Sequence, residues 1–174
     1  IHLLESVSDA NGFAIRFSYS AEGYLRNITD SAGRHLRVEY DVRNGRIMEI
    51  WAPHPENADE EIILASYDYD AEGNMIRQRN AVGDAMLYEY AGRLIVKETW
   101  RNGLSWYFEY DDTGIGARCI HTWGGDGIYN HKLKFMNGLT EVLDSHDKLT
   151  VYHHRDGLVY LKIDANGGDH RWKC

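Results

Sequence analysis

The sequence predicts an all-β protein: an array of antiparallel β-hairpins with little or no helix. Turn signals recur about every ten residues, the segments between them alternate apolar and polar side chains, and tyrosines return at a nearly fixed spacing. The composition agrees, because 17 Gly, 12 Tyr and 5 Trp accompany only 2 Pro in 174 residues. That balance suits many short strands joined by tight turns.

Most of the turn signals begin with Asp, Asn or Ser and end with Gly. An Asp or Asn side chain can hydrogen-bond the backbone of its own turn, and Gly tolerates the positive φ that hairpin turns need. Turns so closely spaced leave room for strands of about six residues. They fall at 9–12, 20–23, 30–33, 41–45, 70–73, 80–83, 91–92, 101–103, 111–114, 124–127, 137–138, 144–147, 155–157 and 164–167.

The segments between the turns have a period of two, as half-buried antiparallel strands require. Ile15, Phe17 and Tyr19 alternate with polar or small residues, and the segments 36–40, 86–90, 106–110 and 132–135 repeat this pattern. Segments 158–163 and 170–172 also predict strands. Because an aromatic residue ends many of these strands, we expect the tyrosines of successive repeats to stack as cross-strand ladders.

The most regular unit runs from Tyr69 to Tyr90 as turn, strand, turn and strand. Tyr90 follows Tyr69 by 21 residues, Tyr110 follows Tyr90 by 20, and Tyr40 follows Tyr19 by 21. The Tyr-Asp signature fades towards the end of the chain, whereas the turn spacing continues. We therefore interpret residues 1–174 as one repeat array. Its terminal strands would have unpaired edges, so we expect self-association through them.

One interruption, at about 52–61, contains both prolines, Pro53 and Pro55, and ends in an acidic run. Proline cannot donate a ladder hydrogen bond, and hairpin loops accept insertions at little cost. The segment therefore predicts a solvated loop insertion, with strand pairing resuming over 62–67. Docking of a partner is its functional alternative.

Charge and hydropathy exclude several classes of function. The net charge of −8 argues against nucleic acid as a partner, because phosphate binding depends on clustered Lys and Arg. No apolar run approaches the roughly 20 residues of a membrane helix, so we expect no membrane insertion. The first residues show no signal-peptide pattern. Cys119 and Cys174 are the only cysteines; a disulfide between them is conceivable, but two unpaired thiols are the favoured interpretation.

The sequence offers weak candidates for catalytic or metal chemistry. The densest histidine cluster is His153-His154-Arg155-Asp156, with His146 and Asp147 upstream. Adjacent strand residues point to opposite faces, so this spacing disfavours a shared metal ion. Cys119 and His121 share a strand face but have no identifiable third partner. The Gly124–Gly127 segment has no following helix to assist phosphate binding and predicts a turn. We expect no catalytic residue, no metal site and no cofactor.

Exposed aromatic rings suggest one binding function. Flat amphipathic rings can stack on the apolar faces of sugars, and the candidates are Tyr24, Trp51, Tyr88, Tyr107 and Trp123. Tyrosine recurs at fixed repeat positions, however, which favours packing as the reason for these rings.

The pattern Tyr-Asp-x-x-Gly-x-(Leu/Ile/Met) resembles the repeat of the YD-repeat, or Rhs-repeat, family. Its clearest copies are Tyr40-Asp41 to Ile47, Tyr69-Asp70 to Ile76, Tyr90 to Leu94 and Tyr110-Asp111 to Gly114. The resemblance implies a segment of a curved β-shell. In bacterial Rhs proteins such a shell encloses a C-terminal toxin that is delivered to other cells, often by type VI secretion or within insecticidal toxin complexes. In teneurins a similar shell belongs to a cell-surface adhesion protein.

Bacterial Rhs shells usually end in a self-cleavage motif built around Asp-Pro-x-Gly-Leu. This sequence has no Asp-Pro, since Pro53 follows Ala52 and Pro55 follows His54, so no catalytic residue is carried over. The resemblance then implies an interior or N-terminal piece of the shell, made in the bacterial cytoplasm and delivered as part of an effector in interbacterial competition. Its partners would be the rest of its shell and the enclosed toxin. The alternative is a carbohydrate-binding or cell-surface binding module.

Overall fold

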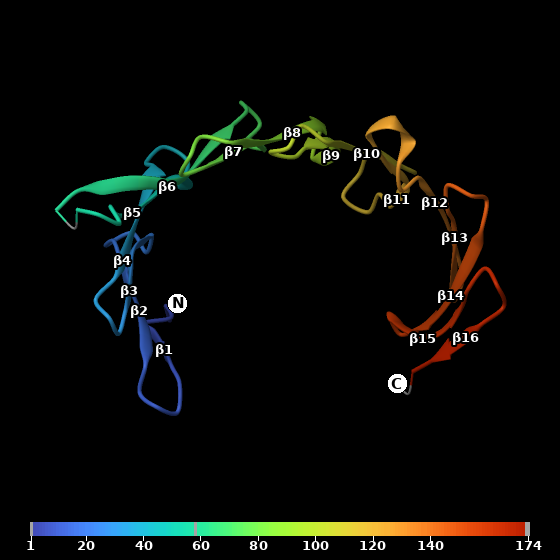
Figure 1. Cartoon of the computed structure of the whole chain (residues 1–174), viewed down its shortest axis with the longest axis horizontal. Helices are drawn as coiled ribbons and strands as arrows, with labels where there is room; N and C mark the ends of the chain where they lie inside the picture. The colour runs from blue at the N-terminus through green and yellow to red at the C-terminus, as the bar shows by residue number, and fades with distance from the viewer. Residues whose placement is uncertain (1, 58, 173–174) are drawn as a thin grey trace. The chain divides into compact units, whose positions relative to one another are not determined.

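The computed structural model describes residues 2–57 and 59–172. Apart from one short 3₁₀ turn, η1 (Gly125–Gly127), the regular structure of these residues is β-strand. Sixteen strands form one antiparallel sheet, and their order in the sheet is their order along the chain (Figure 1). The predicted all-β array of antiparallel hairpins with little or no helix is confirmed.

The chain divides into two compact units between Met86 and Leu87. The first unit appears in blue to green in Figure 1. Its strands are β1 (Ser6–Ser8), β2 (Ala14–Tyr19), β3 (Leu25–Asp30), β4 (His35–Asp41), β5 (Arg46–Pro53), β6 (Glu61–Tyr69) and β7 (Met75–Asn80).

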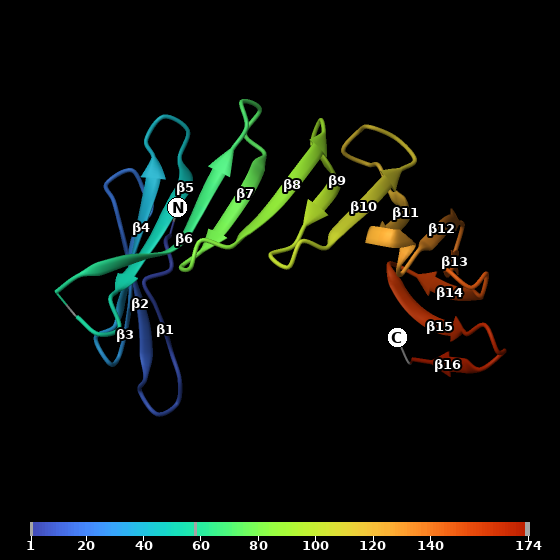
Figure 2. The same ribbon diagram turned by 45° about the horizontal axis from the view of Figure 1, so that its top comes forward.

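Strand β8 (Ala85–Ala91) contains the division between the two units. In Figure 2 the strands of the second unit follow one another from green-yellow to red. They are β9 (Leu94–Thr99), β10 (Ser105–Tyr110), β11 (Cys119–Gly124), β12 (His131–Met136), β13 (Leu139–Leu143), β14 (Leu149–Arg155), β15 (Leu158–Ile163) and β16 (Asp169–Arg171).

The turns are held by side chains that bond to their own backbone, as the sequence predicts. In five turns the first side chain accepts hydrogen bonds from the N–H groups of the second and fourth following residues; these are Asp9, Asp30, Asn80, Asp144 and Asp164. The fourth turn residue has positive φ and is Gly in four of them. In the fifth it is Asp147, at φ 56°, one of the few residue types that tolerate this region.

A β-bulge recurs on the second strand of seven hairpins in the described chain. Asp68 pairs with Arg77 and Tyr69 pairs with Met75, so Ile76 is an extra residue. The same shift inserts one residue in each of the other six hairpins, namely Arg26, Met48, Leu64, Val96, Ile120 and Tyr160. A bulge interrupts the regular ladder and increases the local twist.

The repeat tyrosines connect one hairpin to the previous one through their hydroxyl groups. The Tyr69 hydroxyl donates to the carbonyl oxygen of Ile47 at 2.9 Å, and Tyr110 donates to Ile95 at 2.9 Å. Ile47 directly precedes the bulge residue Met48, and Ile95 directly precedes the bulge residue of its own hairpin. The bulge therefore lies beside the carbonyl that the next repeat binds. Burial raises the pKa of Tyr69 and of Tyr110, so both stay neutral donors.

The expected stacking of repeat tyrosines is therefore wrong for these positions. Tyr19 likewise donates its hydroxyl, to the carbonyl of Leu4 at 2.8 Å. Ring contact does occur between Tyr24 and Tyr40, with centroids 5.1 Å apart, but Tyr24 follows the turn glycine and is not the repeat tyrosine. A hydrogen bond to a fixed carbonyl specifies register more sharply than contact between ring faces.

Two residues that follow a turn glycine, Arg46 and Tyr24, also reach towards the next repeat. The Arg46 guanidinium lies over the Tyr69 ring, 5.6 Å from its centroid. A Cβ atom at Gly73 would collide with this guanidinium. Tyr24 lies in the same way against Gly45. Both glycines have positive φ, 85° and 68°. Glycine is therefore required here both for backbone conformation and for the close approach of a neighbour.

The chain has almost no enclosed core. Among the described residues only Val38, Asn74 and Gly124 are buried, and most strand residues are half-buried. The accessible surface is 12249 Å², whereas a compact monomer of this mass exposes roughly 8,700 Å². A single sheet layer with no second layer packed against it accounts for the excess.

The insertion is narrower than predicted. Strand β5 extends to Pro53, which pairs with Glu61 at the start of β6. The connecting loop is therefore 54–60 rather than 52–61, closed by a hydrogen bond from the His54 N–H to the Glu60 carbonyl at 2.8 Å. Pro53 is tolerated because it is the last residue of its strand.

We predict that Tyr69→Phe lowers the free energy of unfolding by about 1 kcal/mol, because it removes a half-buried hydrogen bond and leaves the Ile47 carbonyl without that donor. Urea denaturation followed by circular dichroism measures the change. Tyr67→Phe is the matched control, since no hydrogen bond of the Tyr67 hydroxyl is seen among the described residues. Equal destabilisation by both substitutions would contradict the proposed link.

We predict that acid destabilises the fold partly through the turn carboxylates. Backbone N–H groups hold the pKa of Asp144 and of Asp164 below the usual value. Their stabilisation is therefore present above the unfolded pKa of about 3.9 and is lost as the pH falls through the folded pKa. Replacing both residues by Asn should reduce the fall in Tm between about pH 5 and pH 2, because Asn80 shows that an amide makes the same two bonds.

The control for this acid series is Asp147→Asn. Asp147 lies in the same turn as Asp144, but among the described residues no N–H of that turn donates to the Asp147 side chain. If Asp147→Asn reduced the acid sensitivity of Tm as much as the paired substitution, the turn carboxylates would not be its source.

Candidate functional site

In the first unit one face of the sheet is apolar. The cross-strand pairs Phe17–Ile28, Ile28–Leu36 and Val38–Ile50 place these side chains on that face. Val38 is its most buried member, only 2% exposed. The face follows directly from the period of two in the sequence.

The opposite face of the first unit carries a network of ion pairs. Arg37 bonds to Glu39 and, at 2.7 Å, to Glu61, and it also lies 4.9 Å from the Trp51 ring centroid. The Arg37 hydrogen bond lowers the pKa of Glu61. These groups are partly exposed, so each pair contributes little stability, and their main effect is to fix which strands lie opposite each other.

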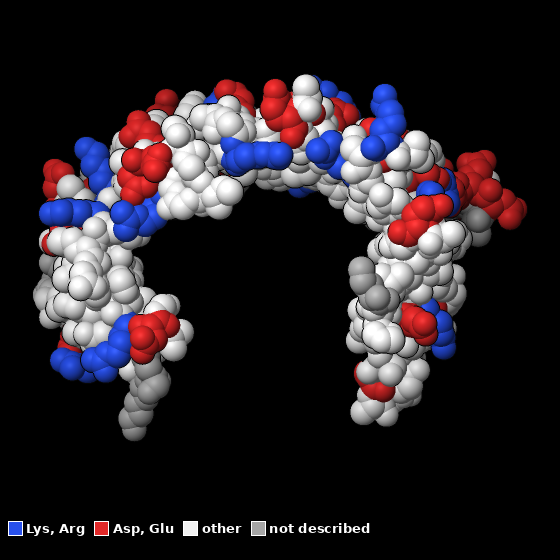
Figure 3. Space-filling model, turned by 180° about the vertical axis from the view of Figure 1, so that it is seen from behind, with Lys and Arg blue, Asp and Glu red and all other residues white. Residues whose placement is uncertain are grey.

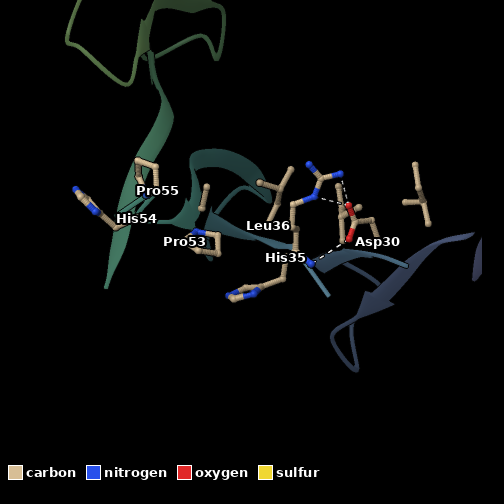
Figure 4. A pocket seen from close by; sticks show the side chains of 10 residues that line it. Asp30, His35, Leu36, Pro53, His54 and Pro55 are labelled. Carbon is tan, nitrogen blue, oxygen red and sulfur yellow. Dashed lines mark hydrogen bonds and ion pairs between the residues drawn. The ribbon is translucent and has the colours of Figure 1, made fainter. Parts of the chain in front are cut away.

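An apolar concavity of about 590 Å³ lies in the first unit (Figure 4). It is lined by Leu36 of β4, Pro53 of β5 and Pro55 of the inserted loop, with Asp30 at its rim. Asp30 is engaged by its own turn, and its hydrogen bond with Arg34 lowers the Asp30 pKa. The concavity presents apolar surface, the ion pair of Asp30 with Arg34 and the imidazoles of His35 and His54.

In the second unit the Cys119–His121 candidate does not form a catalytic pair. The Cys119 thiol lies 3.4 Å from the backbone carbonyl of His121. The imidazole instead faces Glu109 and Asn130, at 3.0 Å from each. Burial raises the pKa of Cys119, which disfavours the thiolate. Cys119 has a free thiol, and Cys174 lies outside the described residues.

The structure separates the histidine cluster. A bulge lies opposite His153 and His154. The His153 ring is 6.2 Å from the Tyr160 ring, while His154 Nε2 lies 3.4 Å from the Thr140 hydroxyl. His146 lies in the preceding turn, beside Ser145. No group of three or more His, Cys, Asp or Glu in the described chain is placed to hold a metal ion. The Gly124–Gly127 segment forms η1 and the turn around it.

The aromatic residues proposed as sugar platforms contact other side chains. Tyr107 and Trp123 stack on each other, with centroids 5.3 Å apart and planes 14° apart. Tyr24 contacts Tyr40, and the Trp51 indole N–H donates to Glu49 at 3.0 Å. Burial raises the pKa of Tyr88, the fifth candidate. Their faces serve packing within the sheet.

Another aromatic cluster lies at the end of β9, the start of β10 and the loop after β11. The sequence did not predict it. Trp106 lies between Trp100, 5.5 Å away, and Tyr129, 6.0 Å away by ring centroids. We call these three residues the Trp106 cluster. Trp106 Nε1 is buried and has no hydrogen-bond partner among the described residues. A buried unsatisfied donor costs about 1–3 kcal/mol.

Tyr129 is the exposed member of the Trp106 cluster, with 68% of its surface accessible. Its backbone is left-handed at φ 47°, a conformation that costs about 1–3 kcal/mol for a bulky residue. Two unfavourable features thus meet at one place on the surface. No sequence pattern marks it, because its members come from three segments of the chain.

The surface carries both signs of charge. Figure 3 shows Lys and Arg beside Asp and Glu on the visible face, with uncharged surface between them. No helix in the described chain has the length and apolar character needed to cross a membrane.

Comparison with known proteins gives a family and a fold. The family model described as the teneurin YD-shell matches residues 3–164. A search of curated proteins returns no match. Among solved structures, a TcdB2–TccC3–Cdc42 complex aligns with a TM-score of 0.62 at 14% identity, over 88% of this chain and 9% of that chain.

Two further solved structures share this fold. A TcdB2–TccC3 structure gives a TM-score of 0.62 at 14% identity, over 91% of this chain and 10% of that chain. The Tc holotoxin pore of Photorhabdus luminescens gives 0.54 at 21% identity, over 83% of this chain and 7% of that chain. The chain spans a tenth or less of the length of these proteins, and likeness at such identities shows a shared fold. The family match and this fold confirm the resemblance found in the repeats: the chain belongs to the teneurin YD-shell family.

Proposed function

We propose that this chain is a structural wall segment of an Rhs-type β-shell that encloses a toxin domain. The observation that carries the proposal is the single-layer sheet, whose strands follow chain order and whose surface of 12249 Å² exceeds that of a compact domain. Such a sheet leaves both faces uncovered. Both faces of the sheet are also uncovered in the wall of a hollow container, because one face contacts solvent and the other contacts the cargo.

The links between repeats support this role. The hydroxyls of Tyr69 and Tyr110 and the guanidinium of Arg46 connect neighbouring hairpins. A repeat array of this kind is stabilised by nearest-neighbour contacts and can extend over many hairpins without a central core. We propose that residues 1–174 form one continuous stretch of such an array, with the insertion as a local loop.

The partners in this proposal are the remainder of the shell and the enclosed toxin. The similar structures contain TcdB2 with TccC3, and one of them is a Tc holotoxin pore. The resemblance to bacterial Rhs proteins extends the proposal to synthesis in the bacterial cytoplasm and delivery as an effector, by type VI secretion and in competition between bacteria. The exposed edges of β1 and β16 would mediate self-association when the chain is isolated. The chain itself has no catalytic role in this proposal.

A carbohydrate-binding or cell-surface binding module is the alternative. It is less well supported, because the rings proposed to bind sugars contact each other or neighbouring side chains. Titration with glycans that quenched tryptophan fluorescence would favour it.

We predict that this segment, joined to the rest of its array, protects an enclosed cargo from protease. The measurement compares the rate of cargo cleavage within the assembled shell with the rate for cargo alone. A shell whose array lacks residues 1–174 is the matched control and should lose protection, because the wall is then interrupted. Cargo cleaved equally fast with and without the intact shell would contradict the proposal.

A further inference from the structure

We propose that the junction between β11 and β12 is a built-in opening point of the second unit, where the sheet separates before the hairpins on either side of the junction unfold. At this junction the series of tyrosine hydroxyl links is interrupted. Opening of the junction is a property of the free chain, so it goes beyond the wall role and does not depend on it.

The tyrosine links follow a fixed rule of register. Tyr110 lies three residues after Tyr107, whose cross-strand partner is Lys97, and its hydroxyl binds the carbonyl of Ile95, two residues before Lys97. The same offsets hold at two other junctions, which are the link from Tyr69 to Ile47 beside the pair Ser66–Glu49 and the link from Tyr19 to Leu4 beside the pair Arg16–Ser6. These last two strand pairings are antiparallel like the first. The register of two neighbouring strands therefore specifies which residue carries the linking hydroxyl.

At the β11–β12 junction this position is occupied by Phe135. The last cross-strand pair before it is His121–Lys132, so the same offsets select Phe135 of β12 and the carbonyl of Cys119 of β11. Cys119 directly precedes the bulge residue Ile120, as the acceptors of the other links precede theirs. Phenylalanine has no hydroxyl, so the Cys119 carbonyl does not receive this link. A concavity of about 400 Å³, lined by Ile120 and Phe135 among others, lies at this place.

Strand pairing is also short at this junction. In the described chain β11 pairs with β12 at His121–Lys132 and at Thr122–His131, whereas the other pairings with a described register have three or more residue pairs. The chain passes from β11 to β12 through η1 (Figure 2), and the His121 imidazole lies 3.0 Å from Asn130 in that loop. The contacts therefore gather at the loop end of the junction, and the end towards the concavity is held weakly.

Side chains add little across the junction. The Arg118 guanidinium lies 4.8 Å from the Phe135 ring centroid, where other junctions have a hydroxyl link. Arg118 already bonds to Asp111 at 2.9 Å and is largely exposed, so this contact contributes little. Lys134 of β12 lies 3.9 Å from Glu141 of β13, away from β11. Among the described residues no ion pair joins β11 to β12.

Native-state hydrogen exchange of the whole ¹⁵N-labelled chain measures the opening equilibrium at each amide. We expect the amides of 121, 122, 131 and 132 to open more often than those of 97–99 and 105–107, because the β9–β10 junction has both a tyrosine link and a longer pairing. This opening should occur without unfolding of the second unit, so it should not change at low urea concentration.

An added hydroxyl tests the cause. Phe135→Tyr supplies a donor for the Cys119 carbonyl and should lower the opening equilibrium of the β11–β12 amides about fivefold, the effect of one net hydrogen bond. The amides of the β9–β10 junction should not change. Phe108→Tyr is the matched control, because Phe108 of β10 does not occupy a link position. The converse change, Tyr110→Phe, should raise the opening equilibrium of the β9–β10 amides by about the same factor.

Three results would overturn the proposal. The first is that the β11–β12 amides open only with the whole second unit, or no more often than those of the β9–β10 junction. The others are a Phe135→Tyr variant that leaves them unchanged or that protects all amides of the unit equally. The measurement on the natural protein is decisive even if Phe135→Tyr does not fold. Failure of the wall role would appear separately, in the protease experiment.

Discussion

The hydrogen bond from a repeat tyrosine to the carbonyl that precedes a bulge is the interaction on which the rest of the fold depends. Tyr69 reaches Ile47, and Tyr110 reaches Ile95. Each bond crosses from one hairpin to the previous one, so it fixes the register between repeats rather than within them. The turn that follows Tyr69 must leave room for this contact between hairpins. Gly73 in that turn has positive φ, and the Arg46 guanidinium lies against its backbone.

This arrangement explains why a protein with almost no enclosed core can still form regular structure. An isolated two-stranded hairpin is marginal in water. Here each hairpin is stabilised by its two neighbours, through strand pairing, hydroxyl links and half-buried aromatic or aliphatic side chains. The cost is an exposed sheet, in which most strand residues are only half-buried. The Trp106 cluster holds a buried indole N–H that has no hydrogen-bond partner among the described residues.

Much of the fold could be predicted from the sequence because the signals are local. An Asp followed by a Gly three residues later specifies a turn by its own hydrogen bonds, and the strand from Leu158 to Ile163 falls where the alternation placed it. The expected loop at about 52–61 is shorter in the structure, since the pairing of β5 with β6 continues to Pro53. Cys119 and His121, which the alternation places on one strand face, contact different partners in the structure.

The bulges and the hydroxyl links could not be predicted in the same way, because they depend on which hairpins lie side by side. One signal was available: two apolar residues in succession, such as Met75-Ile76 or Ile95-Val96, break the alternation where the bulge occurs. The Trp106 cluster had no signal of this kind. Its residues are brought together only by the pairing of β9, β10 and β11 and by a loop that folds back over Gly124.

The central claim is that neighbouring hairpins are coupled through the tyrosine hydroxyls. Native-state hydrogen exchange of the first unit tests it most directly, because it reports the free energy at which each hairpin opens. The account predicts that the amides of the β4–β5 and β6–β7 hairpins share one opening free energy in the natural protein and separate into two when Tyr69 becomes Phe. Independent opening of the two hairpins in the natural protein would contradict it.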